Sequence, residues 1–216
     1  MNPDPSGGSD SSGDKNPPVW FREKDKDGHT PLIVAIEARS AATLIVLLRA
    51  GGDCAFERSE KTGNACIHAF AAKGYLVAMK LLKDNPAAYG ARNIEDQSAY
   101  HLAAEKNQSA FMATFFAYAK GDDVNINSAD AYRRPPLFYA ARSGSLAAAR
   151  WLMSKKADTT QVDEKGNTLM HYAALSDRVY MVDYFKKLKV PHNIKNKDGK
   201  LPMDLAKSKR VKQLLK

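Results

Sequence analysis

A short string that combines a turn residue, a glycine and a helix start recurs along this chain at nearly constant spacing. It is clearest at residues 27–32 (DGHTPL) and at residues 166–171 (GNTLMH). Counted from the slot that Gly28 holds, the copies begin at positions 28, 63, 96, 133, 166 and 199. A fixed period of about 20–50 residues indicates a protein built from stacked units, which usually offers an extended binding face.

One copy predicts a pair of antiparallel helices. In the first copy, Asp27-Gly28 is a turn signal because glycine tolerates a positive φ. Thr30 can cap the next helix and Pro31 suits its first turn. The apolar spacing then predicts one helix over residues 32–38 and another over 41–49. One such pair cannot cover its own apolar side, so successive pairs must stack.

These residues resemble the ankyrin repeat, whose pattern contains Thr-Pro-Leu-His, a pair of alanines and a glycine between the helices. The chain carries that pattern at Thr30-Pro31-Leu32, Ala103-Ala104, Ala140-Ala141 and Gly144. The resemblance implies an all-α fold, an ankyrin-type helix-turn-helix solenoid with extended turn tips, over residues 20–216. We expect repeats at about 26–58, 61–93, 94–128, 131–161, 164–196 and 197–216.

Several copies depart from the family pattern. Residues other than histidine stand in the histidine slot of the first, fourth and sixth copies: Ile33, Phe138 and Asp204. Asp96 and Arg133 stand where the turn glycine is usual. The last copy has a shortened second helix, expected over residues 211–216, whose lysines suit the polar outer face of a C-terminal cap.

The first 19 residues differ in composition from the rest. Pro, Gly, Ser, Asp and Asn dominate them, so residues 1–19 are predicted to be a disordered tail. The tail lacks the apolar segment of a signal peptide, and the chain has no apolar run of about 18 residues. We therefore expect a cytoplasmic chain without a transmembrane segment; the basic residues between 207 and 212 weakly match a nuclear signal.

Both cysteines, Cys54 and Cys66, stand in slots where the repeat wants a small apolar residue. Two cysteines do not make a disulfide framework. We interpret them as reduced, packed thiols, with a disulfide or a reactive thiol as the alternative.

The net charge of +9 comes entirely from residues 150–216, which hold 16 Lys and Arg against 7 Asp and Glu. One interpretation is a solvated polar face with a basic end. The other is a docking patch for an acidic partner, nucleic acid or anionic lipid.

Three histidines invite an enzymatic or metal-binding interpretation, and the period argues against it. His68, His101 and His171 fill the same slot of different copies. Stacked helices lie about 8–10 Å apart, whereas zinc needs its ligands about 2 Å from one ion. We expect each imidazole to tie its own turn to a neighbouring loop by hydrogen bonds. No catalytic residues, metal or cofactor are predicted.

The ankyrin resemblance implies protein binding by the turn tips and the adjoining first helices. The residues predicted for this role are Tyr132, Arg134, Arg142, Lys73, Glu105, Lys106, Lys165, Asn167 and Leu175. Aromatic residues and arginine are enriched in binding hot spots, and Tyr132 lies in the longest insertion, residues 120–134. The alternative is that Tyr132 packs back onto a neighbouring turn.

The sequence therefore predicts a non-enzymatic, monomeric module for protein–protein interaction, a scaffold or adaptor. Its partner is expected to be a protein, and an acidic one would suit residues 150–216. The alternatives are a binder of nucleic acid or anionic lipid through that basic region, and an effector that an intracellular pathogen directs at its host.

Overall fold

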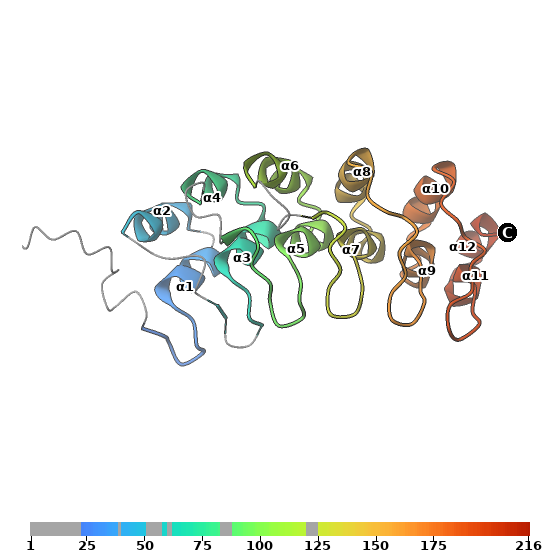
Figure 1. Cartoon of the computed structure of the whole chain (residues 1–216), viewed down its shortest axis with the longest axis horizontal. Coiled ribbons are helices and arrows are strands. Elements are labelled where there is room, and N and C mark those ends of the chain that lie inside the picture. Colours follow the sequence, from blue (N-terminus) through green and yellow to red (C-terminus); the bar gives the residue numbers. More distant parts are fainter. Residues whose placement is uncertain (1–22, 39, 51–57, 60–61, 83–87, 120–124) are drawn as a thin grey trace, which may run out of the picture.

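The computed structural model describes residues 23–38, 40–50, 58–59, 62–82, 88–119 and 125–216. Within these ranges the chain is an all-α solenoid in which pairs of antiparallel helices follow one another along the long axis (Figure 1). The predicted tail, residues 1–19, lies outside the described residues, as do Cys54 and the start of the insertion, 120–124.

The helices form two layers. The first helices of the pairs are α1 (Pro31–Glu37), α3 (Cys66–Lys73), α5 (Ala99–Glu105), α7 (Pro136–Ser143), α9 (Leu169–Leu175) and α11 (Pro202–Leu205). The second helices are α2 (Ala41–Arg49), α4 (Leu76–Leu81), α6 (Ser109–Tyr118), α8 (Leu146–Ser154), α10 (Val179–Lys187) and α12 (Lys209–Leu214). In the described part of the chain, no helix is long and apolar enough to cross a membrane.

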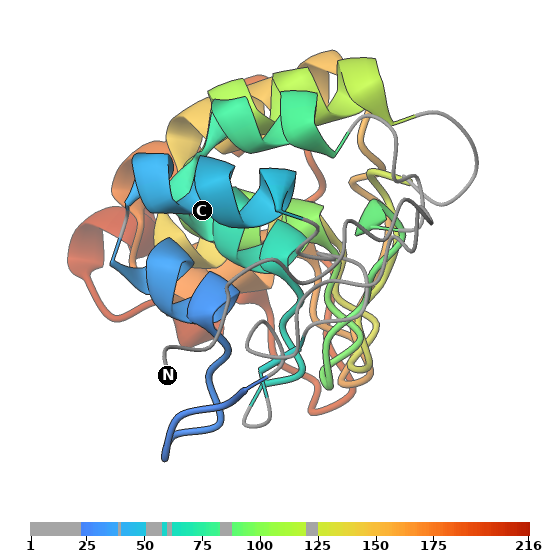
Figure 2. The ribbon, with the colours of Figure 1, turned by 90° about the vertical axis from the view of Figure 1, so that its left-hand side faces the viewer.

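The turn tips project from one side of the first-helix layer, away from the second helices (Figure 1). Seen from one end, successive helix pairs are stepped relative to one another, and the tips of the later repeats lie together on one side (Figure 2). The fourth, fifth and sixth tips are residues 130–134, 163–167 and 196–200. Each is closed by a backbone hydrogen bond from its first residue to its last, of 3.1, 3.0 and 2.9 Å.

Neighbouring tips are also joined to one another. The backbone N–H of Glu164 donates to Tyr132 O at 3.2 Å, and that of Lys197 donates to Lys165 O at 2.9 Å. The tips therefore form a continuous hydrogen-bonded ladder beside the first helices. Such a ladder holds the side chains of successive tips at fixed positions along one surface.

Small side chains allow the first helices to approach closely. The alanine pairs of α5, α7 and α9 are fully buried: Ala103 and Ala104, Ala140 and Ala141, Ala173 and Ala174. Between the layers, larger rings fill the space, and the Tyr100 ring lies 5.0 Å from Phe115 and 5.9 Å from Trp151. Cys66 is buried and free, which confirms a packed thiol at this position.

The histidine slot ties consecutive units together, as predicted. His101 Nδ1 accepts from Ser98 N at 3.0 Å, so its Nε2 carries the proton and donates to Arg134 O at 3.0 Å. His68 donates in the same way to Gln97 O at 2.8 Å, and His171 to Lys200 O at 3.0 Å. Burial is the main cause that lowers the pKa of His68 and of His101 to about 4. Each ring is a neutral structural link.

Two of the three exceptions in this slot, Phe138 and Asp204, follow from their helix caps. Phe138 follows Pro135, which caps α7 and has no backbone N–H to donate to an imidazole. In α11 a carboxylate replaces the ring, and Asp204 Oδ2 accepts from Leu201 N at 2.8 Å. The slot thus carries an acceptor in α11, where the cap offers a donor, and a phenyl ring in α7, where it offers none.

Two predicted helix boundaries are wrong by one or two residues. The first helix runs from Pro31, not 32, because Thr30 caps it; Thr30 Oγ1 accepts from Ile33 N at 3.4 Å. The last helix spans Lys209–Leu214 rather than 211–216, because Ser208 Oγ accepts from Val211 N at 3.2 Å and starts it early. The second helix of the first pair, 41–49, is confirmed.

Candidate functional site

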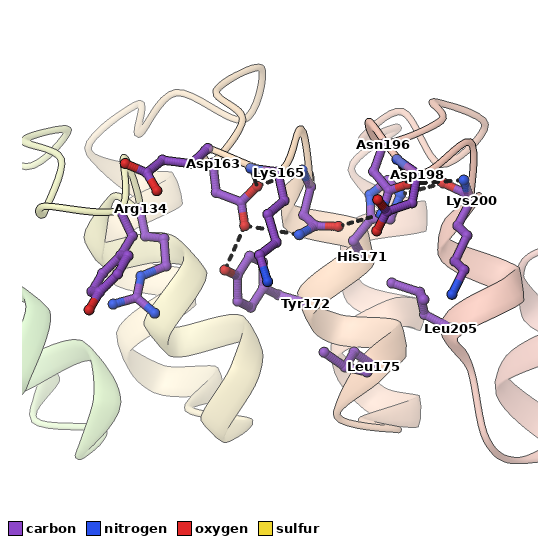
Figure 3. A pocket seen from close by; sticks show the side chains of 13 residues that line it. Arg134, Asp163, Lys165, His171, Tyr172, Leu175, Asn196, Asp198, Lys200 and Leu205 are labelled. Carbon is purple, nitrogen blue, oxygen red and sulfur yellow. Dashed lines mark hydrogen bonds between the residues drawn. The ribbon is translucent and has the colours of Figure 1, made fainter.

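A hollow of about 440 Å³ lies on the surface formed by the tips and the first helices. Its walls come from the fourth, fifth and sixth tips, and its floor comes from α9 and α11 (Figure 3). Several residues predicted for partner binding line it together: Tyr132, Arg134, Lys165, Asn167 and Leu175. Residues that are distant in sequence thus share one concave site, which we call the tip pocket.

The fourth tip is organised by a buried carboxylate. Asp130 Oδ1 accepts from the backbone N–H groups of Tyr132 and Arg134 at 2.9 and 2.8 Å. Asp130 Oδ2 accepts from Arg134 Nε at 2.7 Å and from the Tyr139 hydroxyl at 2.6 Å. Burial alone would raise the pKa of Asp130, but hydrogen bonds from Arg134 and Tyr139 outweigh it and hold the pKa below its usual value.

Arg134 fills the space beside this carboxylate. Its guanidinium carbon lies 4.4 Å from the centre of the Tyr132 ring and 5.1 Å from that of Tyr139. Tyr132 therefore packs against the arginine of its own tip, yet 47% of it stays exposed. Asp130 offsets the charge of Arg134, and the guanidinium and the Tyr132 ring form an aromatic–guanidinium stack at the surface of this tip.

The fifth tip has the same plan with a shorter side chain. Asp163 Oδ1 accepts from Lys165 N and Asn167 N at 2.8 and 2.7 Å. Its Oδ2 accepts from Asn167 Nδ2 at 2.9 Å and from the Tyr172 hydroxyl at 2.8 Å. Asn167 stands one repeat after Arg134, and among the described residues its side-chain amide makes hydrogen bonds with Asp163 and Asn196. The hollow opens where an arginine would otherwise lie.

The floor of the tip pocket is apolar and its walls carry cations. Leu175 on α9 is 46% exposed, and Tyr172 and Leu205 lie beside it. Figure 3 shows Lys165 and Lys200 extending from their tips down toward the helices, whereas Asp198 stays near Asn196. Neither lysine has an ion pair with any residue that the structure describes.

The other predicted residues do not line this hollow. Arg142 lies over the Tyr139 ring at 5.0 Å and pairs with Glu105 at 3.6 Å. Lys106 pairs with the same Glu105 carboxylate at 3.7 Å. These three form a charged cluster on the ends of α5 and α7. Lys73, exposed at the end of α3, stands apart from both groups.

Sequence reasoning missed the residues that build the site from within. It did not select Asp163 for the site, although this carboxylate accepts a hydrogen bond from the Tyr172 hydroxyl. It did not select Asp130 or Tyr139. A signal was available, because an aspartate followed nine residues later by a tyrosine occurs at 130 and 139 and again at 163 and 172.

A second hollow, of about 500 Å³, lies at the C-terminal end of the stack, and Lys209, Lys212 and Lys216 contribute to its wall. Among the described residues, no group of three His, Cys, Asp or Glu is placed to hold a metal ion.

Comparison with known proteins identifies the family. The family profile for three ankyrin repeats matches residues 67–163, 101–198 and 137–216, which together cover more than half of the chain. The chain belongs to the ankyrin repeat family, and its fold confirms the resemblance seen in the sequence. Ankyrin repeats are general modules for protein–protein interaction.

Individual relatives are distant. The chain is 30% identical to the tyrosine-protein kinase Shark of Drosophila melanogaster over 61% of its own length and 14% of that protein. It is 25% identical to the putative ankyrin repeat protein L371 of Acanthamoeba polyphaga mimivirus, over 74% of its own length and 20% of that protein. It is 23% identical to mouse inversin, over 70% of its own length and 14% of that protein. The chain thus spans a fifth or less of the length of these relatives.

Proposed function

We propose that this chain is a non-enzymatic scaffold or adaptor that binds a protein partner along its turn tips and first helices, with the tip pocket as the anchor. The observation that carries the proposal is the half-exposed pair of Tyr132 and Leu175, which line one hollow. In this proposal the module acts as a monomer in the cytoplasm.

The site is prepared for binding before any partner arrives. Hydrogen bonds fix the fourth and fifth tips through Asp130 and Asp163, and Arg134 is held between two tyrosine rings. A surface that is already ordered loses little conformational entropy on association. Tyrosine and arginine in such positions are typical of the few residues that carry most of the binding energy.

The side chains near the pocket are poorly suited to catalysis. Both nitrogens of the His171 ring are engaged, one by Thr168 N and one by Lys200 O. Burial, together with the nearby Asp163 carboxylate, raises the pKa of Tyr172 above its usual value. A general base needs a free lone pair and a pKa near the working pH, and these groups offer neither. Their arrangement supports a binding role.

The proposal is tested by affinity capture from cell extract with quantitative mass spectrometry. We expect Tyr132→Ala combined with Arg142→Ala to lose the proteins that the wild-type chain retains, and Leu175→Asp to lose them as well. Truncating a hot-spot residue costs about 2 kcal/mol or more, which is at least about thirtyfold in affinity. Sedimentation and imaging of a tagged chain test the oligomeric state and the location.

The matched control is Val46→Ser combined with Val77→Ser on the second helices α2 and α4. These valines are also exposed, but they lie on the layer away from the tips (Figure 1). Thermal unfolding of each variant checks that the stack stays intact. If the tip variants retain the same proteins as wild type while the control loses them, the binding surface is on the second helices and the proposal is wrong.

A further inference from the structure

The tip pocket combines an apolar floor with two lysines that make no ion pair with any residue that the structure describes. Tyr172, Leu175 and Leu205 supply apolar surface at the level of the helices. Lys165 and Lys200 extend toward that level from opposite tips (Figure 3). Because these lysines come from the fifth and sixth tips, their ammonium groups lie on either side of the floor.

The other charged groups around the pocket are already engaged or lie at its rim. Asp130 offsets the charge of Arg134 across 2.7 Å. The buried Asp163 carboxylate accepts four hydrogen bonds from within its own tip and helix. Glu164 and Asp198 are exposed residues of the fifth and sixth tips. Of the charged side chains in the lining, those of Lys165 and Lys200 extend toward the floor without an ion pair to a described residue (Figure 3).

We propose that the tip pocket binds an extended peptide segment that carries an apolar side chain between two carboxylate residues. This inference rests on the function proposed above and names the chemistry of the partner. The apolar side chain would lie on Leu175 and Tyr172, and the carboxylates would pair with Lys165 and Lys200. A hollow of about 440 Å³ is large enough for such an anchor and its flanking groups.

Long-range charge favours the same partner. Residues 150–216, which contain both lysines, hold the whole net charge of +9. Complementary charge accelerates association and selects against partners of the wrong sign. The apolar anchor would supply most of the affinity, and the carboxylates would supply orientation and specificity.

The test selects a displayed library of random dodecapeptides on the full chain. We expect the retained peptides to share a leucine or aromatic residue flanked by Asp or Glu. Synthetic copies, titrated by fluorescence anisotropy, should bind Lys165→Glu/Lys200→Glu at least about tenfold more weakly. Selection on that variant should instead enrich Lys or Arg beside the apolar residue. Binding to wild type should weaken as salt is raised.

The control is Lys209→Glu/Lys212→Glu, which makes the same change in net charge at the C-terminal hollow. Its affinity for the selected peptides should stay within about twofold of that of wild type. That small loss reflects the weaker long-range attraction. Thermal unfolding checks that all variants are folded. If the control pair removes binding and the pocket pair does not, the acidic segment binds at the basic end and the inference is overturned.

The remaining outcomes separate this inference from the proposed function. Peptides without an acidic bias that are lost with Leu175→Asp would overturn the inference and leave the protein-binding pocket standing. Peptides unaffected by both Leu175→Asp and Tyr132→Ala would overturn both. A selection that enriches no peptide would also overturn the inference. So would a single-stranded oligonucleotide or phosphatidylserine vesicles that bind the chain more tightly than the peptides do, if Lys165→Glu/Lys200→Glu abolishes that binding.

Discussion

The fourth and fifth tips have the same backbone plan and present opposite surfaces. In both, an aspartate accepts two backbone N–H groups and a tyrosine hydroxyl. The fourth tip continues with Arg134, which fills the concave side between two rings. The fifth continues with Asn167, which ends at Asp163 and Asn196 and leaves a hollow. We infer that the side chain in this repeated slot decides whether the surface is closed or open.

The two tips also differ in how the preceding unit holds them. His101 donates a hydrogen bond to the carbonyl of Arg134 in the fourth tip. Phe138 stands in the corresponding slot before the fifth tip and has no donor to offer. The open tip is therefore held by fewer links than the closed one. Fewer links make local adjustment to a partner easier.

The largest expected difference in stability between the fourth and fifth tips comes from replacing the aspartate of each tip in turn. Asp130→Ala removes the nearer carboxylate from the mostly buried guanidinium of Arg134 and leaves the 3.7 Å ion pair with Glu95, so we expect a loss of about 3 kcal/mol. Asp163→Ala leaves only neutral donors without an acceptor, for which about 1–3 kcal/mol is expected. Urea unfolding of the two variants, followed by circular dichroism, measures both values.

Asp130→Asn combined with Arg134→Asn is the control for the charge, since it gives the fourth tip the amide side chain of the fifth. It should recover part of the stability lost in Asp130→Ala. Equal losses for the two alanine variants would show that the charge of Arg134 does not distinguish the tips.

Acid should loosen the fourth tip more than the fifth. Burial holds the pKa of His101 at about 4, below the 6.5 of a free imidazole, so the folded chain keeps it neutral. Below pH 6.5 the unfolded chain binds a proton that the folded chain does not. The free energy of unfolding therefore falls between pH 6.5 and 4, by up to about 1.4 kcal/mol per pH unit for this residue, and levels off below.

His101→Gln should reduce the pH dependence of the free energy of unfolding by the contribution of one bound proton. Unfolding midpoints measured from pH 7 to 4 test this. Hydrogen exchange should show the acid effect at residues 130–134 before residues 163–167. An unchanged slope in the variant would mean that His101 is not the group that titrates.

The smallest expected effect concerns the turn position itself. Arg133 and Gly166 hold the same slot with φ of +62° and +74°. Gly166→Ala should cost about 1–2 kcal/mol, because a Cβ is strained there and would lie 3.1 Å from Lys197 N. Arg133→Gly should be neutral or stabilise by up to about 1 kcal/mol. Thermal unfolding of both variants measures these changes. Destabilisation by Arg133→Gly would mean that the arginine side chain supports the fourth tip.

Much of the fold followed from the repeat in the sequence. The period located the tips and the helix pairs, and it predicted that His68, His101 and His171 are structural links rather than a metal site. The ankyrin resemblance, rather than the period, selected Tyr132, Arg134, Lys165, Asn167 and Leu175, which the structure brings to one pocket. The tips, the helix pairs and the histidine links follow from residue type and spacing.

The remainder depends on side-chain geometry that spacing does not specify. Whether Arg134 turns inward is decided by the buried Asp130 and by two rings, one of them contributed by α7. The early start of α12 depends on Ser208, which Asp177 of the preceding pair holds at 2.8 Å. Contacts of this kind join residues from different elements, so a single repeat read by itself does not reveal them.

The most direct test of the central claim is to close the open tip with the residue that closes its neighbour. Asn167→Arg places an arginine beside Asp163 and Tyr172, where it should fill the tip pocket as Arg134 fills the fourth tip. We predict a free energy of unfolding within about 1 kcal/mol of that of wild type, because the buried Asp163 carboxylate gains a cation while Asn196 loses a hydrogen-bond partner. Affinity capture should then lose the proteins that wild type retains. A folded Asn167→Arg chain that retains the same proteins in the same amounts would contradict the assignment of the tip pocket as the binding site.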